Sequence, residues 1–234
     1  SGALSLTTGT AAFGGTGTVK LQSGDSLDRG RGGDITASVG SGLSGIGGTV
    51  SIAAGDQIST FAHSVGGDVT VAAGRGVDAS GNIDVFTRAS TGNTGSVSVQ
   101  TGSTSAGSAG ALTLQAGQTS SFTDGKGGSV TVAAGHALEG QGGDIALTAG
   151  STSGRAATGG RVAIVSGAAR ASTTSGQVLV ATGDSEGASG SLNVVTGTAQ
   201  TASSGSVAVR TGPSDRDRSG RIDVIAGASG SGTG

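Results

Sequence analysis

The chain has 234 residues, among them 50 glycines and four phenylalanines, and it contains no tryptophan, tyrosine, cysteine or methionine. This composition excludes an ordinary core of large side chains, disulfide bonds and thiolate metal sites. The 13 basic and 15 acidic residues give a formal net charge of -2, which excludes a nucleic-acid footprint and a polybasic membrane contact.

One eight-residue repeat organises the chain. It reads Gly, any, apolar, any, apolar, any, small, Gly, and we number these positions one to eight. In chain order the fifteen repeats are 2–9, 17–24, 33–40, 48–55, 67–74, 81–88, 95–102, 110–117, 128–135, 143–150, 160–167, 176–183, 190–197, 205–212 and 220–227. They begin 14 to 19 residues apart, and segments of 6 to 11 residues, which we call returns, connect them.

The apolar residues of each repeat lie two positions apart, as in the first pair, Leu4 and Leu6, and in Val69 and Val71. A period of two is typical of a β-strand with one buried face. The seventh position is small, except that the third repeat exchanges two volumes and places a valine there. The sequence therefore predicts one short strand in each repeat, with bulky residues at its start and small residues at its end.

The returns are too short for a crossover helix, and they predict a chain that coils back after each strand. Flanking glycines suit the corners because glycine accepts positive φ, although Arg88 replaces one closing glycine. Five returns place an apolar residue three positions after the closing glycine, which we expect on a second inner wall: Leu27, Leu43, Ile58, Val77 and Leu138. Phe61 and Phe122 lie in the two longest returns, which are expected to bulge, with the ring covering a corner or plugging a wider rung.

Stacked repeats of this kind predict an all-β fold: a single parallel β-solenoid (β-helix) of about fifteen short rungs, flattened and uncapped. Residues 1–234 would form one continuous repeat domain, a segment of a longer chain or fibre. An antiparallel meander is the main alternative, but it does not explain why every repeat runs from bulky to small in one direction.

Residues for catalysis or metal binding are sparse. His63 and His136 lie in different returns, about five rungs apart in the predicted solenoid, too far apart to share a proton transfer. Gly-Gly-Asp occurs before an apolar residue at Asp34, Asp68 and Asp144, but never in consecutive repeats, so solvated carboxylates are favoured over a calcium site. The sequence predicts no catalytic residue, no cofactor and no metal site.

Apolar residues also collect on the opposite face of the later repeats. They are Val165, Leu179, Val195 and Ile225, and we call them the lateral stripe. An apolar stripe indicates a contact surface, so we expect lateral packing against another copy or a partner chain. Ordinary β-propensity at exposed positions is the competing explanation.

Two repeats, GSVSVQTG at 95–102 and GALTLQAG at 110–117, resemble the Gly/Ser/Thr-rich β-solenoid repeats of secreted surface and adhesin-like proteins. The resemblance covers nearly the whole chain and assigns no functional residue. It implies an extracellular or cell-surface stalk, fibre or matrix component.

The expected function is therefore structural rather than enzymatic: a rigid rod, stalk or filament subunit that associates with itself or with neighbouring repeat chains. No nucleic acid and no membrane insertion are expected. The alternative is an ice-binding or carbohydrate-binding β-solenoid, because Ser and Thr recur at the fourth position between Thr36 and Thr131, interrupted by Asp84.

Overall fold

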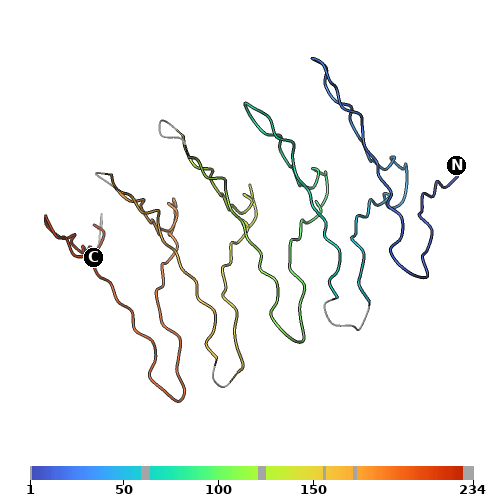
Figure 1. Cartoon of the computed structure of the whole chain (residues 1–234). Coiled ribbons are helices and arrows are strands. Elements are labelled where there is room, and N and C mark those ends of the chain that lie inside the picture. Colours follow the sequence, from blue (N-terminus) through green and yellow to red (C-terminus); the bar gives the residue numbers. More distant parts are fainter. Residues whose placement is uncertain (1, 59–63, 121–124, 155–156, 171–172, 229–234) are drawn as a thin grey trace. The chain divides into compact units, whose positions relative to one another are not determined.

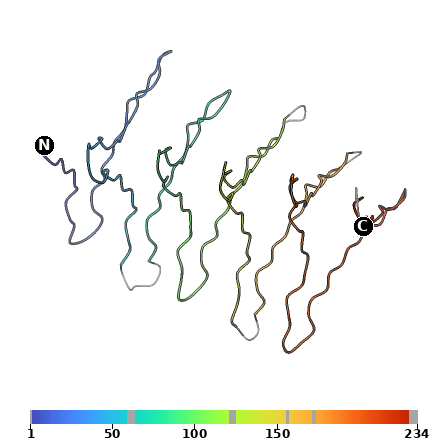
Figure 2. The same cartoon turned by 180° about the vertical axis from the view of Figure 1, so that it is seen from behind.

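The fold is described from a computed structural model, which defines residues 2–58, 64–120, 125–154, 157–170 and 173–228. Within these ranges the backbone forms no helix and no β-strand, so there are no element bounds to give (Figure 1). The view from behind shows the same coil (Figure 2). The predicted all-β fold, a parallel β-solenoid or β-helix, is therefore wrong, and the antiparallel meander is not formed by the described residues either.

The surface area explains this outcome in physical terms. The chain exposes 23685 Å². A protein of 21.6 kDa that folds around a core exposes about 9,000 Å², and its unfolded chain exposes about 31,000 Å². No described side chain is buried. The apolar alternation thus marks a face on each repeat, but no second layer covers that face.

Backbone pairing is confined to a few places. Among the described residues, backbone–backbone hydrogen bonds join glycines at the ends of successive repeats or lie within two returns. None joins the interior positions of two repeats, so no ladder forms. A period of two fixes which side chains share a face, but a strand also needs a partner for its N–H and C=O groups.

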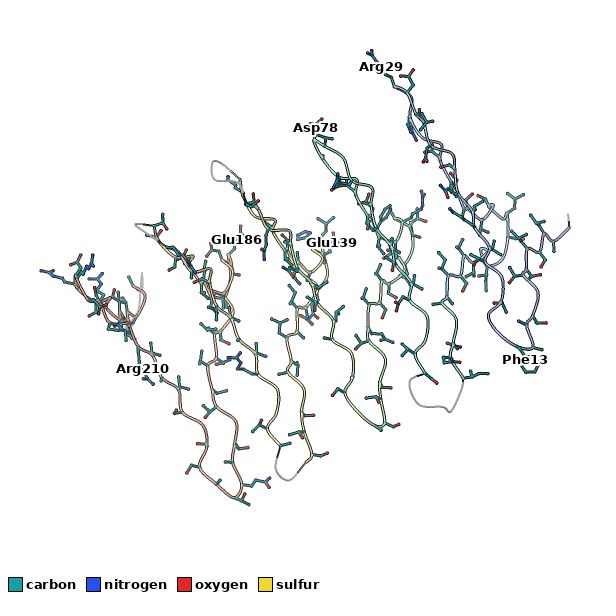
Figure 3. The ribbon with its side chains drawn as sticks, viewed as in Figure 1. Phe13, Arg29, Asp78, Glu139, Glu186 and Arg210 are labelled. Atoms are coloured by element: carbon teal, nitrogen blue, oxygen red, sulfur yellow. The ribbon has the colours of Figure 1, made fainter. Side chains whose placement is uncertain are left out.

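The division into repeats and returns does appear in the path of the chain. The described bends all lie in returns: 12–14, 28–30, 43–45, 77–78, 91–92, 105–107, 138–140, 186–187, 200–202 and 215–217. Phe13, Arg29 and Asp78 lie in three of these returns, with side chains that extend away from the ribbon (Figure 3).

In four returns, a Ser or Thr two residues after the eighth position of the preceding repeat accepts a backbone hydrogen bond, and three of these returns bend at that point. The hydroxyl oxygens of Ser90, Thr104, Thr152 and Ser185 each accept a hydrogen bond from the N–H two residues later, at 3.1 to 3.2 Å. Such a side-chain turn satisfies a backbone donor without a partner strand. These returns are shaped locally rather than by packing.

Two predictions about the returns need correction. The apolar residues assigned to a second wall, from Leu27 to Leu138, are 90% to 108% exposed. Positive φ occurs among described glycines at Gly14, Gly45 and Gly107, which lie within returns and not at the ends of repeats. Phe61, Phe122 and His63 lie outside the described residues.

Contacts divide the chain into two units, Ser1–Leu112 and Thr113–Gly234. The boundary falls inside the repeat 110–117, yet every opening glycine and the seventh residue it faces lie within the same unit. Each connection between repeats can therefore be considered within its own unit.

Candidate functional site

The most regular feature of the chain is the contact between one repeat and the next, which we call a joint. At each joint, the first glycine of a repeat faces the seventh residue of the repeat before it. A β-carbon added at this opening glycine would lie within 4 Å of that residue's side chain in all fourteen joints. At Gly128, for example, it would lie 3.1 Å from Cβ of Ala116. In seven of the fourteen joints the nearest distance is below 3.4 Å, so a side chain at the opening position would force the preceding repeat to shift, whereas in the other seven it would make an ordinary van der Waals contact.

The closing glycine behaves differently. No atom lies within 4 Å of an added β-carbon at any closing glycine from Gly9 to Gly227. This matches the presence of Arg88 at the same position in the repeat 81–88. The two glycines of the repeat are therefore not equivalent, although the sequence shows both in almost every repeat.

Six joints are closed by a backbone hydrogen bond, donated by the opening glycine N–H to the carbonyl of the preceding closing glycine. The donor–acceptor pairs are Gly67–Gly55, Gly81–Gly74, Gly128–Gly117, Gly143–Gly135, Gly160–Gly150 and Gly176–Gly167, at 2.8 to 3.0 Å. Each bond ties the two ends of a return together. It satisfies one donor and one acceptor that would otherwise face water.

The apolar pairs at the third and fifth positions form the largest exposed apolar feature. From Val19 onward the third-position side chain is 50% to 59% exposed in every repeat. Leu4, whose repeat follows no other in this sequence, is 96% exposed, so the preceding joint supplies the partial cover. The large fifth-position side chains, from Leu6 to Val224, are 63% to 93% exposed. Each repeat thus presents two apolar side chains to water.

The lateral stripe is also exposed. Its four members, Val165, Leu179, Val195 and Ile225, are 78% to 87% exposed, and nothing covers them in a single chain. Their exposure is compatible with a contact surface but does not test one. The stripe stays a prediction.

Within the part of the chain that the structure describes, charged groups form no recognisable binding site. Arg31 pairs with Asp34 and Arg221 with Asp223, all largely exposed. Among the described residues there is no cluster of three or more His, Cys, Asp or Glu that could hold a metal ion, and no pocket was found. In the same part of the chain, no helix is long and apolar enough to cross a membrane.

Sequence reasoning missed the joint. The signal is present in the sequence, since the opening glycine occurs in every repeat and the seventh residue is small in all but the third, but each feature also fits rung packing or a corner. The Ser and Thr turns were also missed. Their signal is a hydroxyl residue two positions after the repeat, as at Ser90 and Ser185.

Comparison with known proteins adds no relative. No protein-family model matches the chain, and no match was found among the curated proteins or the solved structures. The function is therefore argued from the residues of this chain.

Proposed function

We propose that the chain is an extracellular structural repeat protein that builds a stalk, fibre or matrix by self-association through its apolar pairs. The observation that carries this proposal is the exposure of two apolar side chains in repeat after repeat. A soluble chain rarely leaves so many apolar groups uncovered unless they meet a partner. The extracellular location rests on the resemblance to secreted surface repeats.

A second copy of the chain is the partner that fits best. Its pairs have the same spacing, and the net charge of -2 over 234 residues leaves little repulsion between copies. Covering a half-exposed Val or Leu contributes about 1 kcal/mol. Association costs about 4 to 15 kcal/mol in lost freedom, so several repeats must engage together.

Nothing in the described residues favours the ice-binding or carbohydrate-binding alternative. Ice binding needs a flat, preformed array, and the Ser and Thr residues at the fourth position are exposed on a backbone that no sheet holds flat. Carbohydrate clefts are expected to use aromatic platforms, and the chain has four phenylalanines and no other aromatic residue.

The proposal is tested by two matched triple variants. Ile164, Val194 and Val224 occupy fifth positions, and replacing all three by Lys places charge in the apolar pairs. Val165, Val195 and Ile225 are their immediate neighbours at sixth positions, so the corresponding triple Lys variant adds the same charge to the same repeats. Light scattering over a concentration series then compares both with the unmodified chain.

We expect the fifth-position variant to need at least about tenfold more protein to associate, since a loss of 1.4 kcal/mol is tenfold in affinity. The sixth-position variant should change less. A loss confined to the sixth-position variant would assign the contact to the lateral stripe instead, and equal losses would indicate a general effect of charge. Either result contradicts assembly through the pairs.

A further inference from the structure

We infer that the γ atom of the seventh residue decides whether a joint is locked by its backbone hydrogen bond. A locked joint has the glycine-to-glycine bond described above, and an open joint lacks it. The six locked joints have Ala54, Ala73, Ala116, Ala134, Ala149 and Ser166 at the seventh position. The eight open joints have Thr8, Ser23, Val39, Thr87, Thr101, Thr182, Thr196 and Thr211 there.

Locked joints bring two backbones together. In each of them, the backbone N of the closing glycine lies 3.1 to 3.8 Å from the point where a β-carbon of the opening glycine would stand. The seventh residue contributes its Cβ at 3.1 to 3.6 Å from the same point. Because only this methyl or methylene group lies between the two backbones, the N–H of the opening glycine reaches the carbonyl oxygen of the closing glycine.

Open joints hold a γ atom in that space. In the six Thr joints, Cγ2 lies 3.4 to 3.9 Å from the β-position of the opening glycine, and no backbone atom lies within 4 Å of it. Val39 places Cγ1 there, against Gly48, with the same result. The extra carbon keeps the two backbones apart. At Thr87 the side-chain hydroxyl instead donates to the carbonyl of Gly95, at 3.3 Å.

The two serines at the seventh position fall into different classes of joint. Ser23 approaches the β-position of Gly33 with its Cβ at 3.3 Å and its Oγ at 4.0 Å, no backbone atom lies within 4 Å of that point, and the joint is open. Ser166 approaches Gly176 with its Cβ, the backbone N of Gly167 follows at 3.5 Å, and that joint is locked. A serine can turn its single γ atom away, whereas Thr and Val carry two and have fewer χ1 choices.

A second glycine before the opening glycine is more common in locked joints than in open ones. A second glycine precedes the opening glycine in six joints, at Gly32, Gly47, Gly66, Gly127, Gly142 and Gly159. None of these joints has Thr at the seventh position. Four of these joints are locked, and the two at Gly32 and Gly47 are open. In the four locked joints the β-position of the extra glycine lies 3.6 to 3.8 Å from the closing carbonyl oxygen, and at Gly32 it lies 3.9 Å from it. Close approach is thus matched by small residues on both sides of the joint.

The classes are grouped along the chain. Four successive joints, from Ala116 to Gly176, are locked, and the three that follow, from Thr182 to Gly220, are open. The side chain at the seventh position therefore determines whether a backbone hydrogen bond joins the two ends of the following return. This inference concerns single joints and does not depend on self-association.

Hydrogen exchange of the opening-glycine amides, followed by NMR on the full chain, tests the inference directly. The amide of Gly143 should exchange roughly three- to tenfold more slowly than that of Gly205, as one hydrogen bond of ordinary net strength implies. Ala134→Thr should remove the protection of Gly143. The reverse change, Thr196→Ala, should protect Gly205.

The lock is intramolecular, so the protection should not vary with protein concentration. Equal exchange at Gly143 and Gly205 would overturn the inference. Retention of protection in Ala134→Thr would do so as well, and so would protection that appears only at concentrations where the chain associates.

Discussion

At the scale of single residues, the two glycines of each repeat have different reasons to be there. The opening glycine is contacted by the preceding repeat, whereas the closing glycine faces open space. The sequence alone predicted tolerance at the closing position, because Arg88 occupies it. It could not predict the contact at the opening position, since the contacting residue lies across a return and glycine there is also typical of a turn.

A pair of substitutions in one repeat measures this difference. Gly128→Ala puts a methyl group 3.1 Å from Cβ of Ala116 and should break the bond to Gly117. We expect the residue-128 amide to exchange roughly three- to tenfold faster, with shifted NMR signals at Ala116. Gly135→Ala is the control and should perturb only its neighbours in sequence. Similar long-range shifts in both variants would refute the asymmetry.

At the scale of elements, the repeat and the return follow different rules. The alternation of Val69 and Val71 predicts a strand with one buried face, but both residues are exposed, at 56% and 72%. The pattern could not supply a strand partner, and no ladder forms among the described residues. The returns were predictable as the places where the chain bends. The apolar residues of the returns, such as Leu43, are predicted on a second inner wall. That prediction is wrong because no such wall forms among the described residues.

The Ser and Thr turns in the returns lead to a prediction about single side chains. Ser185→Ala removes the acceptor for the N–H of Gly187, and that amide should exchange a few-fold faster because a bond of about 1 kcal/mol is lost. Ser185→Thr keeps the hydroxyl and should restore the slower exchange. NMR exchange on both variants checks this. Unchanged exchange at Gly187 in the alanine variant would mean that the bend does not depend on the side chain.

At the scale of the whole molecule, the main feature is that no described side chain is buried in a core. The exposed area of 23685 Å² is much closer to that of an unfolded chain than to that of a protein with a core. Composition already indicated that no core of large residues is available. The sequence could not show that small residues would fail to build a thin core instead, because that depends on rungs stacking in register rather than on any one repeat.

Calorimetry of the dilute chain should therefore show no cooperative unfolding peak. A folded protein of 234 residues gains about 3 kcal/mol/K in heat capacity on unfolding, and this chain should gain about a third of that because most of its surface is already exposed. A sharp endotherm with the full heat-capacity change would contradict the absence of a core.

Sedimentation of the unmodified chain across a dilution series tests assembly through exposed apolar pairs most directly. We predict particles heavier than the 21.6 kDa single chain, with a mean mass that rises with protein concentration and falls on dilution. A mass of one chain at every concentration would contradict self-association and, with it, the proposed structural role.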